Sequence, residues 1–227
     1  GAGDIASLPL TKLVREGVIV DVSDAVGDWD VITPGQITDK VQVKRGDILV
    51  IHTGYHRYYQ GMPEQDLTRY FCLHPGGTRE LAEWMLEMEI AWWGVDAGSG
   101  DHPMNTTIRY MRPDLTRRFE EKVGMPVGQF FGEYEYRHKK SGRLVKEDLF
   151  PLHYLAFPEG CIHAENVGGE IDLVLNRRCI IGAFPWKFEG GEACPCRIIA
   201  FFDVGEPSVE ELRGPGVGCG KPGDRRR

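Results

Sequence analysis

The sequence predicts a single domain of class α/β or α+β, and two observations carry that prediction. Short runs rich in Val, Ile and other β-branched or aromatic residues recur along the chain, as is typical of buried strands. One further segment repeats apolar residues at three- and four-residue spacing, as in a helix that packs on a sheet. Because no internal repeat or linker precedes residue 205, we expect residues 1–205 to form one domain of strands with one strong helix and connecting pieces.

Five apolar runs are the expected strands. The second run ends at Thr53 and Gly54, and such strand ends commonly deliver side chains to a functional site. The third run ends at Asp96, in a Gly-rich turn that also carries Ser99. The last two runs are joined by an expected turn at 186–192. The expected strands are 18–22, 48–52, 92–96, 178–182 and 196–202.

The clearest helix is expected at residues 78–88. Thr78 is a suitable N-cap for it. A shorter helix or turn is expected after Thr33, which can act as a cap before Pro34, and a further helix is expected at 113–122. The apolar positions that define the helix at 78–88 are Leu81, Trp84, Met85 and Met88.

Residues 101–148 interrupt this alternation and are expected to be an insertion. The insertion begins with a polar loop and ends in a charged, Gly-containing segment at 133–148 that suits a hairpin or a lid. Residues 55–69, rich in Tyr and Gln, are expected to be a covering loop. Residues 206–227 form a Gly- and Pro-rich tail that ends in three arginines, which indicates a disordered or partner-clamped extension.

The composition is that of a soluble globular protein with a core. Of the 227 residues, 41% are hydrophobic and 27% are charged. The formal net charge of −7 does not favour nucleic acid or an anionic membrane as a partner. No apolar run approaches the ~18–20 residues of a membrane span, and the amino terminus has no signal pattern. We therefore expect neither a nucleic-acid nor a membrane partner.

Cysteine usage and the first residue bear on compartment and processing. Six cysteines in a chain of this length do not make a disulfide scaffold. Cys194 and Cys196 are too closely spaced for the usual C-x-x-C zinc or redox motif. A reducing cytoplasm is therefore the expected location. The chain opens with Gly1 rather than methionine, which either removal of an initiator or cleavage from a longer precursor would explain.

One segment, residues 150–172, carries the most distinctive candidate chemistry. It places His153 and Glu165 twelve positions apart, with a Pro-Glu-Gly turn at 158–160 between them. A neutral imidazole nitrogen and a carboxylate oxygen are both good ligands for zinc or manganese. On spacing alone, a hydrogen-bonded core histidine and a capping glutamate are the commoner explanation.

Several segments, taken in order, resemble the cyclase family of metal-dependent hydrolases, which includes bacterial kynurenine formamidase and isatin hydrolase. The resemblance covers most of residues 5–204, and the ordered set is more specific than any one segment. It rests on Gly46-Asp-Ile-Leu-Val-Ile-His-Thr-Gly54, His74-Pro-Gly with the Trp84 helix, Gly94-Val-Asp-Ala-Gly-Ser99, His153, Glu165-Asn-Val, and 185–200 with Gly190-Gly-Glu-Ala-Cys-Pro-Cys-Arg197.

The resemblance implies a fold and a metal site. The fold it implies is α/β, a single domain with a mixed, barrel-like β-sheet core and flanking helices. It also implies that His153 and Glu165 are metal ligands, since their separation equals the family's own spacing. The metal it implies is a divalent ion, zinc or manganese.

The chain lacks the family signature H-x-G-T-H-x-D-x-P-x-H, which supplies the remaining ligands and an acid/base histidine. In the family this signature lies upstream of the segment that corresponds to residues 7–10. The nearest match here is 52–58, where His52 and His56 have the right spacing but Tyr58 stands where a liganding Asp is needed. We interpret that match as a coincidence. His52 and His56 remain candidates to line the pocket.

From the resemblance we predict one subunit of a metal-dependent hydrolase that cleaves an amide or cyclic amide C–N bond through metal-activated water. A catalytic ion usually has three or more protein ligands. We therefore expect the missing His, His and Asp to come from a second polypeptide, in an oligomer whose substrate is a small amide. The alternatives are a non-catalytic scaffold or regulatory subunit, and a metal-free module that binds a small molecule.

Further residues are assigned roles around this site. His102 is the candidate acid/base, although a solvent-facing loop histidine is the plainer interpretation. Arg197 is equally suited to a substrate carboxylate and to a structural ion pair. Tyr55, Tyr58, Tyr59 and Trp93 suit an aromatic wall or the core. The predicted substrate contacts are His52, Tyr55, His56 and Arg197, and the predicted supports of the metal ligands are Asn166, His163 and Asp96.

Overall fold

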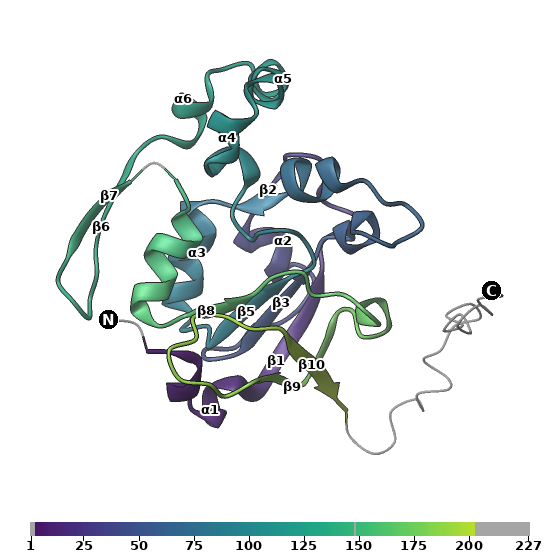
Figure 1. The fold of residues 1–227 in the computed structure, drawn as a ribbon, viewed down its shortest axis with the longest axis vertical. Coiled ribbons are helices and arrows are strands. Elements are labelled where there is room, and N and C mark those ends of the chain that lie inside the picture. Colours follow the sequence, from purple (N-terminus) through teal and green to yellow (C-terminus); the bar gives the residue numbers. More distant parts are fainter. Residues whose placement is uncertain (1–2, 148, 203–227) are drawn as a thin grey trace, which may run out of the picture.

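The architecture is a curled six-stranded mixed sheet with helices on one face and an inserted helical lobe (Figure 1). It is seen in a computed structural model that describes residues 3–147 and 149–202. The strand order is β10-β9-β1-β3-β5-β8. Strands β1, β3, β5 and β8 run parallel, whereas β9 and β10 are antiparallel to their neighbours. Their bounds are β1 Val14–Asp21, β3 Ile48–His52, β5 Trp92–Val95, β8 Ile162–Ala164, β9 Arg177–Pro185 and β10 Cys196–Phe201.

This arrangement confirms the α/β fold with a barrel-like sheet and flanking helices that the sequence predicts. The parallel strands place their carboxyl ends at one edge of the sheet, where side chains from β1, β3, β5 and β8 can meet. The last of the five predicted strands, expected at 196–202, is β10. It ends at Phe201, and the described residues end at 202. The predicted tail at 206–227 lies outside the described residues.

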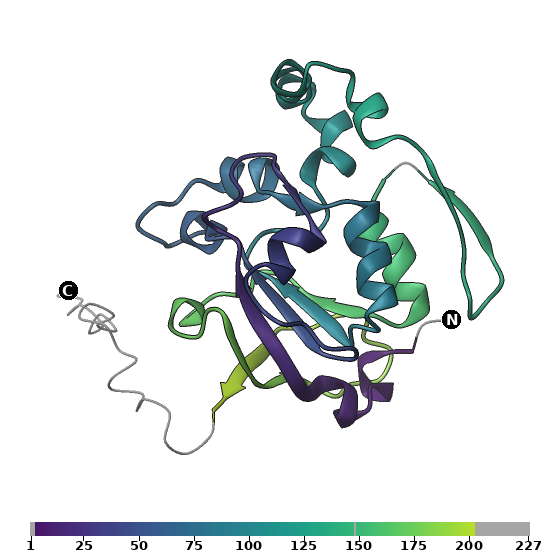
Figure 2. The ribbon, with the colours of Figure 1, turned by 180° about the vertical axis from the view of Figure 1, so that it is seen from behind.

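Alternating side chains divide the core between the two faces of the sheet. Val18, Val20 and Leu49 lie in one buried cluster, which also holds Leu81 and Met85. Their sequence neighbours Ile19, Ile48 and Val50 lie in a second buried cluster, together with Trp92 and Ile181. The helix α3 (Arg79–Glu87) covers the first face beside the helical turn η5 (Leu152–Ala156), as Figure 2 shows from behind.

The expected insertion forms a lobe with a small core that includes two residues from earlier in the chain, Trp29 and Leu73. Trp29, Leu73, Met104, Leu115 and Phe119 make up that core. The predicted helix at 113–122 is observed, and the segment predicted as a hairpin or lid contains the antiparallel pair β6 and β7. The bounds are α4 Ile108–Met111, α5 Pro113–Val123, α6 Val127–Phe131, β6 Tyr134–Arg137 and β7 Leu144–Glu147.

Short elements connect these units. Thr33 accepts a hydrogen bond from the backbone N–H of Gln36 and caps α2 as expected. The Gln36 side chain accepts a hydrogen bond from the Thr33 N–H and completes a capping box. Within the described chain, no helix has the length and hydropathy of a membrane span. The remaining elements are η1 Ile5–Ser7, α1 Leu10–Leu13, β2 Val31–Ile32, α2 Pro34–Thr38, η2 Tyr55–Tyr58, η3 Arg69–Leu73, β4 Gly76–Gly77, η4 Pro103–Asn105, η6 Phe157–Glu159 and η7 Ile171–Leu173.

His102 is buried at the junction of the sheet and the lobe. Its Nε2 lies 2.8 Å from the carbonyl oxygen of Trp29, and its Nδ1 accepts a hydrogen bond from the Met104 N–H at 3.1 Å. The rings of Phe119 and Phe131 lie 5.3 and 5.0 Å from the imidazole. Burial lowers the pKa of His102 from 6.5 to about 3. The folded protein therefore keeps this histidine neutral.

A stability measurement against pH tests this assignment. The unfolded chain takes up a proton at His102 below pH 6.5 and the folded chain does not, so its contribution to stability is present above pH 6.5 and is lost toward pH 3. The loss is at most ~1.4 kcal/mol per pH unit. Urea denaturation would measure the free energy of unfolding of the wild type and of His102→Gln at several pH values. Between about pH 6 and pH 4, this free energy should fall less steeply with decreasing pH in the variant. Equal slopes would contradict a neutral buried His102.

Candidate functional site

The two residues predicted as metal ligands lie side by side. His153 lies on η5 and Glu165 follows β8, and the His153 Nε2 is 3.9 Å from the Glu165 Oε1. His163 joins them, with its Nε2 3.5 Å from the same carboxylate oxygen. The side chains of His153, Glu165 and His163 are 29%, 23% and 23% exposed, so the group is partly open to solvent. Sequence analysis had assigned His163 only a supporting role.

Strand geometry explains why His163 and Glu165 face the same way. The residues of β8 are extended, and residues two apart on a strand point to the same face. His163 lies opposite Trp93 of β5, and Asn166 leaves the strand in the left-handed region with φ 57°. The Asn166 N–H donates to the carbonyl of Ala97 at 3.1 Å, and its side-chain oxygen accepts from the Tyr70 hydroxyl at 2.5 Å. Asn166 therefore fixes the chain immediately after Glu165.

A buried carboxylate orients His153. Asp101 is fully buried, and its Oδ2 lies 2.5 Å from the His153 Nδ1 while its Oδ1 accepts the Leu152 N–H at 2.8 Å. A neutral His153 that donates from Nδ1 to Asp101 leaves Nε2 unprotonated and directed at Glu165. A carboxylate behind the ring is the usual support of a metal-binding histidine. Burial lowers the pKa of His153. The hydrogen bond and charge of Asp101 and the charge of Glu165 raise this pKa by more than burial lowers it, so the net shift is upward.

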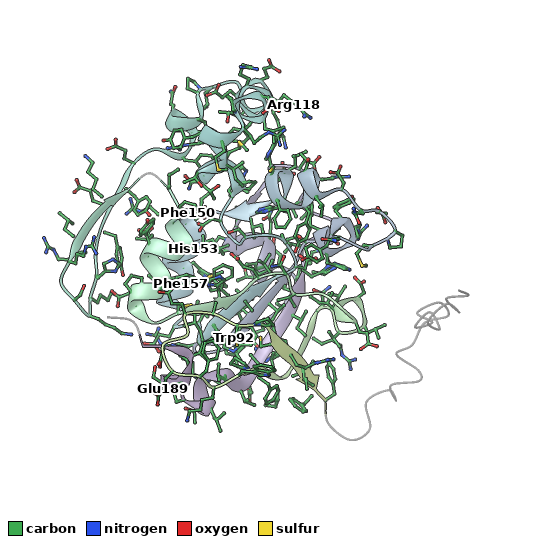
Figure 3. The ribbon with its side chains drawn as sticks, viewed as in Figure 1. Trp92, Arg118, Phe150, His153, Phe157 and Glu189 are labelled. Carbon is green, nitrogen blue, oxygen red and sulfur yellow. The ribbon has the colours of Figure 1, made fainter. Side chains whose placement is uncertain are left out.

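Aromatic rings hold both imidazoles. His163 is stacked between Phe157, at 4.5 Å and 5° between ring planes, and Trp93, at 5.0 Å and 21°. The His153 ring lies 4.7 Å from Phe157 and 5.7 Å from Phe150. Figure 3 shows His153 with Phe150 and Phe157 along the same helical segment. These contacts limit the rotation of the two rings that face Glu165.

The carboxylate of Glu165 is placed as a metal ligand would be. Its Oε1 is buried and accepts no hydrogen bond from the described residues. Burial raises the pKa of Glu165, but the neighbouring His163, His153 and Ser99 lower it more, so the group is ionised at neutral pH. A buried anionic oxygen without a partner is costly. A cation at this point would offset that cost.

The three donor atoms fit a divalent metal. One ligand atom from each of His153, His163 and Glu165 lies within 4.8 Å of the other two. Bonds of ~2.0–2.1 Å in a tetrahedral zinc site place ligand atoms roughly 3.3 Å apart. The spacings of 3.5 and 3.9 Å are close to that value and would contract slightly around an ion.

A second His/His/Asp group lies at the carboxyl ends of β3 and β5. It consists of His52, His56 and Asp172, whose ligand atoms also lie within 4.8 Å of one another. Asp96, predicted to support a metal ligand, is fully buried beside this group and not beside Glu165: its Oδ2 is 3.0 Å from the His56 Nδ1. The two histidines, predicted to contact substrate, are thus gathered around carboxylates.

Other predicted residues lie elsewhere. His102, predicted as the acid/base, has both ring nitrogens engaged with backbone groups, the Trp29 carbonyl and the Met104 N–H, which leaves neither free for proton transfer to a substrate. Its neighbour Asp101 faces His153 instead. The Tyr55 hydroxyl is bonded to Asp28, and burial raises its pKa. Arg197 lies on β10, at the opposite edge of the sheet from β8.

Sequence reasoning missed Asp101 and Asp172. Asp101 is 52 positions from His153 in the chain, and Asp172 is 116 positions from His56. Asp101 lies in the segment after β5 and Asp172 lies in the short turn η7, so no periodic pattern marks either residue. The only available signal for Asp101 was a carboxylate just after the Gly-rich turn that ends the third predicted strand.

Comparison with known proteins agrees with the predicted resemblance. Residues 1–102 match the cyclase family model, described as "Putative cyclase". No curated protein matches the chain. Isatin hydrolase A from Ralstonia solanacearum superposes with a TM-score of 0.60 at 17% identity, over 87% of this chain and 64% of that one.

Two further structures show the same fold. An isatin hydrolase bound to the product analogue thioisatinate has a TM-score of 0.58 at 18% identity, over 87% of this chain and 64% of its own. A predicted metal-dependent hydrolase from Bacillus stearothermophilus has a TM-score of 0.51 at 18% identity, over 87% of this chain and 68% of its own. The chain thus spans 64% of the length of the isatin hydrolases that it matches.

The role of Asp101 can be tested through the titration of His153. In Asp101→Asn the negative charge behind the ring is removed, so the pKa of His153 should fall relative to the wild type. NMR titration of the imidazole signals would measure the change, with His153→Gln used to assign the resonance. Asp114→Asn, at an exposed carboxylate paired with Arg112, is the control and should leave His153 unchanged. An unaltered His153 titration in Asp101→Asn would contradict the orienting role.

Proposed function

We propose that this chain, which has the cyclase family's sequence pattern at residues 1–102 and the fold of its hydrolases, is part of a metal-dependent hydrolase of amide or cyclic amide C–N bonds. The observation that carries the proposal is the buried Glu165 oxygen without a hydrogen-bond partner, which faces the Nε2 atoms of His153 and His163. His153 and Glu165 are the proposed ligands of a divalent ion, and His163 is the proposed third donor. This donor set suits zinc or manganese.

When bound, such an ion lowers the pKa of a coordinated water from ~15.7 toward ~7 and polarises a carbonyl. The residues of the chain prepare that chemistry. Asp101 keeps the proton of His153 on Nδ1, so that Nε2 faces the ion. Glu165 stays ionised because its histidine neighbours outweigh the effect of burial on its pKa. Glu165 therefore serves as a ligand rather than as a base.

The surroundings of the site favour a small planar substrate. Phe150, Phe157 and the half-exposed Tyr154 lie on the same segment as His153. Flat apolar rings of this kind bind planar ligands by stacking. A cyclic amide fused to an aromatic ring has both the scissile C–N bond and a face for such stacking. We therefore propose a small cyclic amide or formamide as the substrate class.

We further propose that a second polypeptide supplies additional His, His and Asp ligands in an oligomer. The signature that carries those ligands in the family is absent from the sequence. An exposed apolar face of the β9–β10 hairpin supports a partner. On it Phe201 pairs with Ile180 and Ile199 pairs with Gly182, and the rings of Phe201 and Phe184 cover Gly182. Ile180, Phe184, Ile199 and Phe201 are 41%, 42%, 39% and 46% exposed.

Ligand substitutions test the hydrolase proposal. His153→Gln and Glu165→Gln each remove one donor, and each should lower both metal affinity and hydrolysis of cyclic amides or formamides by at least ~100-fold, beyond the 10–100-fold typical of supporting residues. Metal content by mass spectrometry and a substrate panel would measure both. Glu170→Gln, at an exposed glutamate nearby, is the matched control and should keep metal and activity. A scaffold or a metal-free binding module would instead show unchanged metal content in both ligand variants.

Substitution of the apolar hairpin face tests the partner. Phe184→Glu and Ile199→Glu together place two charges on that face, and they should abolish co-purification of a second polypeptide because buried charges without partners are costly. Intact mass and peptide mapping of the native complex would identify the companion. Leu144→Glu, at a residue of β7 that is 52% exposed, is the control. A native preparation that contains this chain alone and is fully active would contradict the proposal.

A further inference from the structure

The second His/His/Asp group has the geometry of a closed metal site. The His52 Nε2 lies 3.1 Å from the Asp172 Oδ1, and the His56 Nε2 lies 3.2 Å from the Asp172 Oδ2. These separations are close to the roughly 3.3 Å expected between ligand atoms around tetrahedral zinc. His52 ends β3, His56 lies in η2 four residues later, and Asp172 arrives from η7. The group shares no residue with the one formed by His153, His163 and Glu165.

Each histidine of this group has a carboxylate behind it. The His52 Nδ1 is 2.9 Å from the Asp21 Oδ1, and the His56 Nδ1 is 3.0 Å from the Asp96 Oδ2. Asp96 is itself held by the Thr53 N–H at 2.7 Å, the Thr53 hydroxyl at 2.6 Å and the Gly54 N–H at 2.8 Å. A carboxylate on Nδ1 directs the lone pair of Nε2 outward, as in carboxylate–histidine–zinc arrangements. Here both Nε2 atoms converge on one carboxylate.

The described residues satisfy only part of these contacts: the His56 ring hydrogen-bonds to Asp96 and Asp172, whereas the His52 Nε2 has no hydrogen-bond partner. A neutral histidine has one ring N–H, so if each histidine donates to the carboxylate on its Nδ1, an unprotonated Nε2 faces the Asp172 anion. That juxtaposition is repulsive unless a cation or an additional proton lies between them. The His52 side chain is 3% exposed, and its Nε2 makes no hydrogen bond within the described part of the chain. A metal ion between this Nε2 and the Asp172 carboxylate would take the lone pair of the nitrogen.

We infer that His52, His56 and Asp172 form a second binding site for a divalent transition-metal ion, with zinc as the best fit. Two imidazole nitrogens favour zinc and related ions over magnesium or calcium, which prefer oxygen ligands. Asp172 is 57% exposed, so the ion can enter from solvent and a water can complete the coordination. Asp21 and Asp96 are positioning residues, and they add two negative charges that favour a cation.

The position of Asp172 indicates what the ion would do. Asp172 lies seven positions after Glu165, in the segment that leads from the end of β8 to β9. An ion bound to His52 and His56 would fasten that segment to the end of β3. The site would thereby hold in place the chain that follows Glu165, without contact with the reacting groups. This inference stands on its own residues and does not depend on the proposed hydrolase activity.

Zinc titration of the full chain in the presence of a chromophoric chelator tests the inference. The titration is done in a His153→Gln, Glu165→Gln background, so that the other group does not contribute. We expect this background protein to bind one zinc ion per chain. Asp172→Asn or His56→Gln, added singly, should raise the dissociation constant for zinc at least tenfold. Asp21→Asn should weaken it by 10- to 100-fold as a positioning residue. Replacement of zinc by cobalt should give the intense visible absorption of a tetrahedral ion.

Asp114→Asn is the matched control, since Asp114 is 52% exposed and pairs only locally with Arg112. Asp172→Asn alters an exposed side chain and is the deciding variant if His56→Gln does not fold. No zinc uptake in the background protein, or uptake that Asp172→Asn leaves unchanged, would overturn the inference. The inference is supported if Asp172→Asn loses zinc in the background protein and, in the otherwise wild-type chain, retains hydrolase activity. The hydrolase proposal is tested separately by the His153 and Glu165 variants.

Discussion

Two buried carboxylates at the carboxyl end of β5, Asp96 and Asp101, are the constraint on which the arrangement depends. Both are fully buried, and an ionised carboxylate is costly to bury unless it is paired and hydrogen-bonded. Each meets that requirement in the same way, with backbone N–H donors and one histidine. Asp96 thereby fixes His56, and Asp101 fixes His153. One turn after a central strand therefore positions an imidazole in each of the two His-rich groups.

The parallel part of the sheet explains why these groups are neighbours. β3, β5 and β8 lie side by side and end at the same edge. His52 is the last residue of β3, and Asp96 and Glu165 directly follow β5 and β8. The apolar residues of β1 and β3 hold the strands in register, because a one-residue slip would exchange the side chains that pack in the two core clusters. The packing of the core thus determines the distances among the polar side chains. The β9–β10 hairpin lies at the far edge of the sheet and exposes Ile180, Phe184, Ile199 and Phe201.

Much of the fold could be predicted from the sequence because its signals are local. The strand at 48–52 and the helix around Leu81 and Met85 have strong apolar periodicity, and both were found where expected. The turn between His153 and Glu165 predicts that both side chains reach one pocket, and their nearest ligand atoms lie 3.9 Å apart. The role of Asp101 could not be predicted, since it depends on contact with a residue 52 positions away. For the same reason the sequence did not reveal that His102 faces the carbonyl of Trp29, 73 positions away in the chain.

The most direct test of the proposed metal centre is crystallographic. Diffraction from crystals of the native complex, recorded above and below the absorption edge of its metal, would locate the ion by its anomalous signal. The account predicts a peak bonded to the His153 Nε2 and to the Glu165 carboxylate, at about 2.0–2.2 Å from each. A fully metal-loaded, active enzyme with no peak between these two side chains would contradict it.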